Sequence, residues 1–176
     1  ANIRFGLDFG ITDRLSIGFG RSRFDKLYDF RSKLNILRQT KDGRVPFELA
    51  IQGNAGILTL ENGFDMMDRF NYSGSLMLAR QFGERFSLQL TPIYTHFNTV
   101  FIERDTEGNI IEEANDHLAL SVGGRIVLTE RVALLFEYIP VFGDRSDGTV
   151  DVVGIGVDIE TGGHVFQLFA TTAQGM

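Results

Sequence analysis

No cysteine and no tryptophan occur among the 176 residues, and there are only 3 prolines. Without cysteine, the chain has no disulfide framework, no thiolate zinc site and no cysteine nucleophile. A formal net charge of −6 argues against a nucleic-acid-binding protein, and no extensive basic patch or stripe stands out. No apolar run approaches the roughly 20 residues that a membrane-spanning helix needs. This excludes a helical membrane protein but leaves a membrane β-barrel open, because barrel strands are only half apolar.

Apolar residues recur at every second position along most of the chain. The first segment shows the pattern with Ile3, Phe5, Leu7, Phe9 and Ile11, which alternate with polar residues or glycine. A period of two gives a strand with two unlike faces, whereas a helix needs a period of 3.6. We therefore predict an all-β protein with about ten strands, near residues 2–10, 14–23, 28–38, 45–57, 69–82, 86–97, 117–128, 132–142, 149–160 and 164–173.

Short and long connections alternate between these strands. Similar short phrases, ITDR, FGER and LTER, join strands at 11–14, 82–85 and 128–131, and ETGG and TKDGR add two further tight links. Most of the other connections are longer, polar and mostly acidic, although RFDKL at 23–27 is short. An up-and-down meander places the tight links at one end, here the turn end, and the others at the opposite loop end. Outer-membrane barrels have this asymmetry. We predict one antiparallel up-and-down transmembrane β-barrel domain over residues 1–176; a soluble barrel with its apolar face turned inward is the alternative.

The aromatic residues support the membrane interpretation. All four tyrosines fall at the loop end and share the apolar face of their strands: Tyr28, Tyr72, Tyr94 and Tyr138. An apolar ring with a polar tip prefers the level of the lipid headgroups, which gives membrane barrels an aromatic girdle. Phenylalanines are expected to form the matching belt at the turn end: Phe9, Phe47, Phe82 and Phe86.

Three stretches carry a family resemblance: GLDFGITDRLSIGFGRSRFDKLYDFRSKLNILRQ, PFELAIQGNAGI and GHVFQLFATTAQGM. They resemble an uncharacterised family of Gram-negative outer-membrane β-barrels that carries only a domain-of-unknown-function label. The resemblance implies an outer-membrane barrel and brings no established activity or catalytic residue. If ITDR is periplasmic, both ends of this chain lie at the outer end of a strand, whereas barrel termini normally lie in the periplasm. We therefore expect a further strand on each side, about twelve in all, an even number as in bacterial barrels.

The polar face of the strands predicts a lumen lined by balanced charges: Arg4, Asp8, Arg31, Lys33, Glu48, Arg125, Glu137 and Asp158. Opposite charges that pair across a narrow lumen would close it, and this favours a scaffold or a partner-binding component of an envelope complex. The alternative is a passive pore for small polar solutes or ions, in which these residues tune selectivity. Expected partners are outer-membrane lipid, lipopolysaccharide and possible envelope proteins.

Sites for chemistry are weak in this sequence. His96 and His117 flank an acidic segment with Glu103, Asp105, Glu112, Glu113 and Asp116, but the two histidines have opposite strand parity and are expected to point apart. Oxygen ligands in this segment could bind Ca²⁺, yet no DxDxDG-like spacing supports a dedicated loop. Ser121 shares the lumen face with His117, although a serine on a glycine-rich strand usually serves packing. We expect no enzymatic activity, no cofactor and no metal site.

Overall fold

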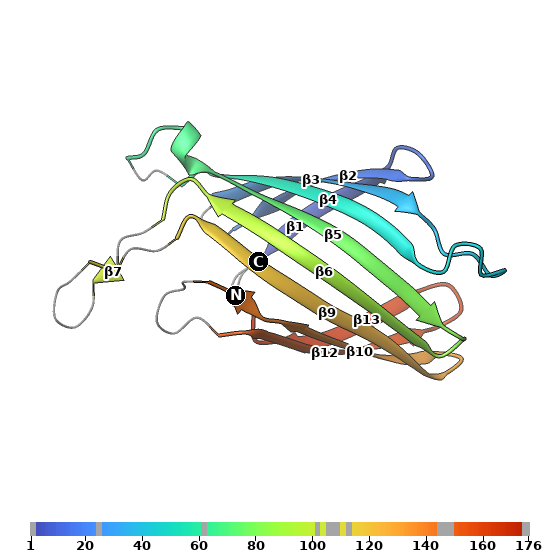
Figure 1. Ribbon diagram of the computed structural model, residues 1–176. Coiled ribbons are helices and arrows are strands. Elements are labelled where there is room, and N and C mark those ends of the chain that lie inside the picture. Colours follow the sequence, from blue (N-terminus) through green and yellow to red (C-terminus); the bar gives the residue numbers. More distant parts are fainter. Residues whose placement is uncertain are drawn as a thin grey trace.

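The computed structural model describes residues 3–23, 26–60, 63–100, 103–104, 110–111, 114–143 and 150–173. Ten long segments of this part are strands, and each lies where the alternation predicts one (Figure 1). They are β1 (Arg4–Gly10), β2 (Leu15–Ser22), β3 (Leu27–Leu37), β4 (Glu48–Leu58), β5 (Phe70–Phe82), β6 (Phe86–Phe97), β9 (Asp116–Thr129), β10 (Val132–Ile139), β12 (Val152–Glu160) and β13 (Val165–Thr171). Short elements complete the set: β7 (Glu103–Arg104), β8 (Ile110–Ile111), β11 (Val141–Phe142) and the 3₁₀ turn η2 (Met67–Arg69). No helix in the described ranges has the length and apolarity to cross a membrane.

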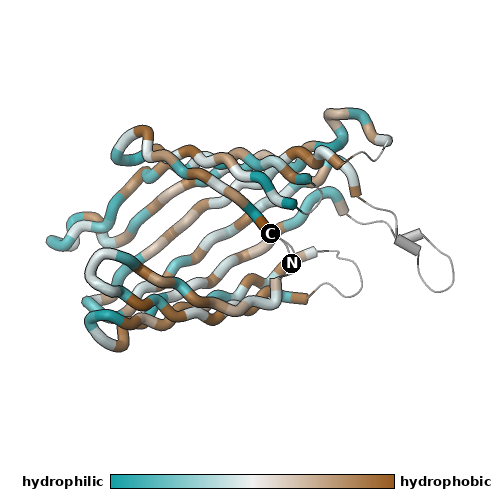
Figure 2. The backbone as a smooth tube through the Cα atoms, turned by 180° about the vertical axis from the view of Figure 1, so that it is seen from behind, coloured by the Kyte–Doolittle hydropathy of each residue, from teal (hydrophilic) through white to brown (hydrophobic). Residues whose placement is uncertain are grey.

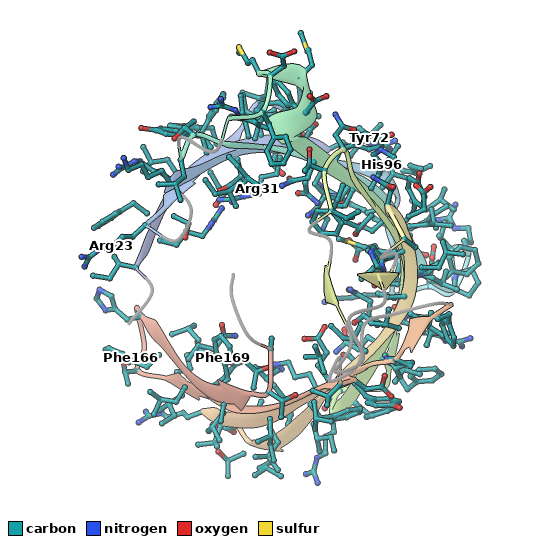
Figure 3. The ribbon with its side chains drawn as sticks, turned by 90° about the vertical axis from the view of Figure 1, so that its left-hand side faces the viewer. Arg23, Arg31, Tyr72, His96, Phe166 and Phe169 are labelled. Carbon is teal, nitrogen blue, oxygen red and sulfur yellow. The ribbon has the colours of Figure 1, made fainter. Side chains whose placement is uncertain are left out.

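The strands form one antiparallel meander in the order β1-β2-β3-β4-β5-β6-β9-β10-β12-β13. Seen along its axis, the sheet curls into a ring (Figure 3). The predicted up-and-down barrel architecture is thus confirmed, but the sheet is not closed, since no described ladder pairs β1 with β13. Every residue of these two edge strands is exposed.

Several strand boundaries differ by a few residues from the sequence-based prediction; β12, for example, begins at Val152 rather than at residue 149. The fourth strand begins at Glu48 rather than at residue 45, so Phe47 precedes it. Proline, which lacks an N–H group, interrupts the predicted strand 132–142 at Pro140. The pairing with β9 resumes in the same register beyond the proline, where Val141 faces Ala119.

The repeated turn phrase has a common physical basis. In ITDR, the Thr12 hydroxyl oxygen accepts hydrogen bonds from the backbone N–H groups of Arg14 at 3.2 Å and Leu15 at 3.0 Å. In LTER, Thr129 does the same for Arg131 at 3.2 Å and Val132 at 3.1 Å. A threonine that satisfies two N–H groups of its own turn favours a tight reversal. FGER replaces the threonine with Gly83, whose φ of 65° lies in the region that glycine tolerates best.

The lengths of the connections between strands do not alternate strictly between short and long, contrary to the sequence-based prediction. At the turn end, the connection 38–47 is longer than the loop-end connection 23–26. The longer one is held to the sheet by Gln39, whose side-chain amide donates to the Gln81 carbonyl at 2.9 Å and accepts from the Gln81 N–H at 2.8 Å. The turn end therefore carries one structured connection beside its tight turns.

Burial is the reverse of that in a soluble protein. Among the described residues, the fully buried apolar side chains are only Ala50 and Ala133, while Ser22, Thr91, Ser121 and Asp158 are buried polar residues. Large apolar side chains are exposed on the outer face, for example Leu76 on β5, which shares the parity of Tyr72 outside the ring (Figure 3). Figure 2 shows the resulting alternation of hydrophobic and hydrophilic residues along the strands. The soluble alternative with an inward apolar face is therefore wrong.

Candidate functional site

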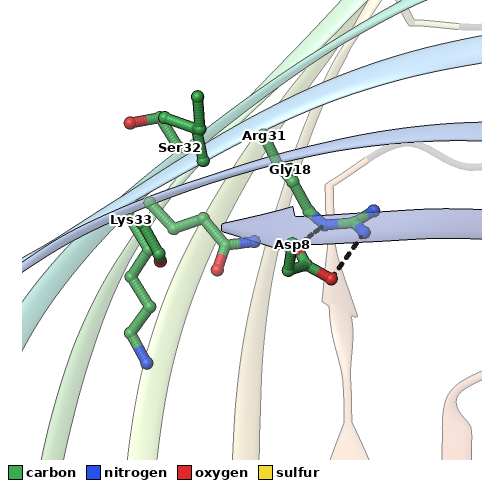
Figure 4. A pocket seen from close by; sticks show the side chains of 8 residues that line it. Asp8, Gly18, Arg31, Ser32 and Lys33 are labelled. Carbon is green, nitrogen blue, oxygen red and sulfur yellow. Dashed lines mark hydrogen bonds and ion pairs between the residues drawn. The ribbon is translucent and has the colours of Figure 1, made fainter. Parts of the chain in front are cut away.

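A cluster of four charged side chains lies on the inner face of β1 and β3. Arg31 donates from Nε to Asp8 Oδ1 at 2.8 Å and from Nη2 to Asp8 Oδ2 at 3.0 Å (Figure 4). The same guanidinium donates from Nη1 to Asp29 at 2.9 Å, and Asp29 also accepts from Arg4 at 2.5 Å. Each arginine thus has a carboxylate partner, and Asp29 joins the two pairs into one network.

Glycines on β2 allow these side chains to meet across an intervening strand. Asp8 and Arg31 both pair with Gly18, so they lie in one row, two strands and about 10 Å apart. A Cβ atom on Gly18 would lie 2.7 Å from Arg31 Nε and would collide with Asp8 Oδ1. Gly20 takes the same position beneath Asp29 and Arg4. The charged side chains therefore lie flat along the wall instead of extending into the lumen.

A second polar cluster lies on β9, β12 and β13. Arg125 on β9 donates to Asp158 on β12 at 3.3 Å, and Gln167 donates to the other carboxylate oxygen at 2.8 Å. The residue of β10 that pairs with Asp158 is Ala133, which is only 1% exposed. Arg125 itself pairs with Leu135, two residues further along β10, so this ion pair crosses the middle strand diagonally.

The described ion pairs of the lumen run along the wall, between β1 and β3, within β3, or between β9 and β12. None of them joins opposite walls, which differs from the expected pairing across a narrow lumen. Glu137 accepts a hydrogen bond from Ser121 at 2.7 Å. Lys33 and Glu48 form no ion pair within the described ranges, and Lys33 extends away from the Arg31–Asp8 pair in Figure 4. Together with Glu137, whose described partner is an uncharged hydroxyl, these two side chains carry the lumen charges that no described ion pair offsets.

The rest of the inner wall divides into a neutral polar sector and an apolar one. On β4 and β5, Gln52 donates to Asn54 at 3.1 Å and Asn54 donates to Ser73 at 3.0 Å. On β10–β13, a cavity of about 440 Å³ is lined mostly by apolar side chains and glycine, among them Leu135 and Phe169. The sequence reasoning predicted a polar lumen face and did not predict the apolar sector.

The tyrosines of the loop end have polar partners for their tips or for their rings. Hydroxyl groups donate from Tyr94 to Asp116 at 2.5 Å and from Tyr138 to Asp151 at 2.7 Å. The Tyr72 ring stacks on His96 at 4.8 Å, and the Arg21 guanidinium lies 5.5 Å from the centre of the Tyr28 ring. At the turn end, the Phe82 and Phe86 rings stack at 5.7 Å, and Phe9 is exposed on β1. The tyrosine rings, which carry a polar hydroxyl group on an apolar ring, suit an interface between lipid and water.

Neither a metal site nor a catalytic pair forms around the described histidines. His96 Nδ1 lies 2.6 Å from Asp116, whereas His117 makes an edge contact with the Phe97 ring at 5.7 Å. Within the described ranges, no group of three or more metal-ligating side chains comes together. The side chains of Glu103, Asp105, Glu112 and Glu113 lie outside the described residues. Ser121, the one serine considered as a nucleophile, donates to Glu137 and not to His117.

One residue of the wall was missed by the sequence reasoning. Asp29, which links Arg4 to Arg31, has the parity of Arg31 and Lys33 on the same strand and could have been assigned to the lumen on that ground. Its role as a bridge depends on the register of β1, β2 and β3, which parity does not give.

Comparison with protein-family models gives a match over the whole chain. Residues 1–176 match the family described as a membrane-bound β-barrel domain, DUF5777. Comparison with curated proteins and with solved structures gave no match. The outward apolar face, the tyrosine rim and the polar inner wall agree with this description, and the chain belongs to the DUF5777 family of membrane-bound β-barrel domains.

Proposed function

We propose that this domain resides in the bacterial outer membrane and acts there as a passive channel for small polar solutes or ions. The observation that carries the proposal is the lateral pairing of the lumen charges. Ion pairs that lie along the wall, over Gly18 and Gly20 on β2 and between β9 and β12, keep long charged side chains out of the centre of the ring. Neutral amide and hydroxyl groups on β4–β6 add a polar lining that needs no partner from the opposite wall. No catalytic step is assigned to the chain.

The outer membrane is proposed because the long acidic connections gather at one end and the tight turns at the other, as in outer-membrane barrels. Fractionation of cells by buoyant density tests this placement. Recovery with the outer-membrane fraction is expected, and recovery with the inner membrane would contradict the proposal.

Single-channel conductance in a planar bilayer tests the channel. Purified protein should give discrete steps, with a cation/anion preference that depends on the lumen charges without described ion-pair partners, which are Lys33, Glu48 and Glu137. Lys33→Gln should shift the preference toward cations, and Glu48→Gln toward anions, because each removes an unbalanced charge from the lumen. Arg131→Gln, at an exposed turn, is the matched control and should leave the preference unchanged. Silence from protein shown to be inserted would refute the channel.

A second candidate function is that of a scaffold or partner-binding component of an envelope complex. The specific observation in its favour is the open sheet, whose edge strands β1 and β13 pair with each other in no described ladder. In lipid, every backbone polar group needs a partner. An inserted but silent protein that copurifies with a fixed stoichiometry of one envelope protein would support this function over the channel.

A further inference from the structure

Three basic residues lie together where β2 passes into β3 at the loop end. Arg21 and Arg23 are both exposed, and the alternation of β2 places them on the outer face, on either side of the buried Ser22. The backbone of Arg23 extends the ladder, since its N–H donates to the Ile3 carbonyl at 2.9 Å. Figure 3 shows Arg23 pointing away from the ring. Lys26 directly precedes β3 and is also exposed.

The backbone of this basic cluster (Arg21, Arg23 and Lys26) is held in place. Lys26 donates from its N–H to the Arg23 carbonyl at 3.4 Å, and its own carbonyl accepts from the Thr59 hydroxyl at 2.7 Å. Lys26 has a φ of 48°, which a lysine adopts at an energetic cost. Local strain of this kind is kept where the surrounding contacts enforce it, and it is often found at functional sites.

The charges of the cluster have no carboxylate partner in the described part of the chain. Among the described residues, no ion pair involves any of the three side chains. By contrast, Arg69, in the loop-end connection between β4 and β5, donates to the Phe64 carbonyl at 2.8 Å. Arg21 lies over the Tyr28 ring, so its guanidinium sits at the level of the tyrosine rim. Three cations without described carboxylate partners therefore lie where lipid headgroups are expected.

The basic cluster also differs in charge from the acidic connection 98–116 at the same loop end. Residues 98–116 contain six acids and one arginine, whereas residues 21–27 contain three basic residues and one acid. An anion that approaches the loop end is repelled by the acidic connections and attracted to the basic cluster. Arginine guanidinium groups recognise phosphate oxygens with paired N–H donors.

We propose that Arg21, Arg23 and Lys26 bind the phosphate groups of a phosphorylated glycolipid in the outer leaflet. The ligand class follows from the outward parity of the arginines, the level of the tyrosine rim and the lack of a described carboxylate partner for the three cations. The two arginines lie two residues apart on a strand, about 7 Å, and so suit a headgroup with more than one phosphate. This assignment rests on the proposed outer-membrane location with the loop end outward, but not on conductance.

Binding of purified lipopolysaccharide to the detergent-solubilised protein tests the site. The variant Arg21→Gln/Arg23→Gln/Lys26→Asn removes all three charges, and asparagine tolerates the backbone conformation of Lys26. The control Arg14→Gln/Arg85→Gln/Arg131→Gln removes three basic residues from the turn end. Each basic residue near an anionic lipid surface contributes to binding, so the first variant should weaken binding about 10-fold or more and the control should match the wild type. Heat-modifiable gel mobility checks that both variants are folded.

Two further probes make the outcome decisive. Lipopolysaccharide without its lipid phosphates should bind to the wild type as weakly as intact lipopolysaccharide binds to the loop-end variant. Equal loss of binding in both variants, or no loss in either, overturns the site. If the loop-end variant loses affinity for phosphatidylglycerol vesicles but not for lipopolysaccharide, the cluster binds a phospholipid headgroup and the glycolipid assignment is wrong. A failure of the outer-membrane location is seen separately, by fractionation.

Discussion

Replacing Gly18 with alanine tests whether charged side chains lie over this glycine. In a strand, alanine is favoured over glycine by about 0.5–1 kcal/mol, because glycine loses more backbone entropy on folding. At Gly18, however, the added methyl group would stand 2.7 Å from Arg31 Nε and 2.9 Å from Arg31 Cγ. Inserting a methyl group where no space exists costs about 1–3 kcal/mol. The two effects leave a net destabilisation of about 1 kcal/mol, together with displacement of the Asp8–Arg31 pair.

Two other glycines provide matched controls with the opposite expected sign. Gly10 lies on the inner face of β1, and Gly53 lies in the middle of β4; at neither position would an added Cβ atom have a neighbour within 4 Å. Alanine at either position should raise the free energy of unfolding by about 0.5–1 kcal/mol. The measurement is urea unfolding of protein folded into lipid vesicles. If Gly18→Ala stabilises the protein as much as the two controls do, the side chains do not lie over Gly18 and the lateral-pairing argument fails.

Two smaller predictions concern the turn-end connection 38–47. Hydrogen bonds from the Thr40 hydroxyl and then from Arg44 hold the pKa of Asp42 below its ordinary value of 3.8. Because the folded pKa is the lower one, the contribution of Asp42 to stability is fully present above pH 3.8 and is lost as the pH falls through the folded pKa; unfolding titrations between about pH 2 and 5 should show this loss in the wild type and not in Asp42→Asn. Gln39→Ala removes both hydrogen bonds to Gln81 and should lower the free energy of unfolding by about 1 kcal/mol, with an unchanged value contradicting the anchoring role.

The fold could be predicted from the sequence because the apolar residues repeat with a period of two, which is the period at which side chains alternate between the two faces of a strand. Residues such as Phe5, Leu7 and Phe9 repeat at the spacing that places them on one face, and membrane strands keep that alternation over their whole length. The tight turns could also be predicted from the sequence, because Thr12 and Thr129 form local hydrogen bonds within four residues. Features that depend only on neighbouring residues at a fixed spacing can be predicted without knowledge of the tertiary structure.

The pairing of the lumen charges was not predictable in the same way. Parity places Asp8 and Arg31 on one face, but their contact depends on a register that brings both residues opposite Gly18. Arg125 and Asp158 meet diagonally, since Arg125 pairs with Leu135 and Asp158 pairs with Ala133 on the strand between them. Sequence reasoning assumed that charges of opposite sign would meet across the lumen, because it had no measure of which residues share a row. Small residues on the middle strand are the signal that could have indicated lateral pairs.

Lateral pairing separates the residues that stabilise the wall from those that set the selectivity of a channel. A close pair such as Arg125 and Asp158 acts on the lumen as a dipole, whose field falls off faster than that of a single charge. Removal of both members, in Arg125→Gln/Asp158→Asn, should therefore reduce stability and leave the cation/anion preference close to that of the wild type. Lys33→Gln should do the reverse, because Lys33 has no ion-pair partner in the described chain and its charge is not offset by a described neighbour. Conductance and urea unfolding measured on the same two variants distinguish these roles. A shift in preference with the neutral double replacement, as large as that with Lys33→Gln, would show that the paired charges act on the solute individually and that the division between wall and selectivity residues is wrong.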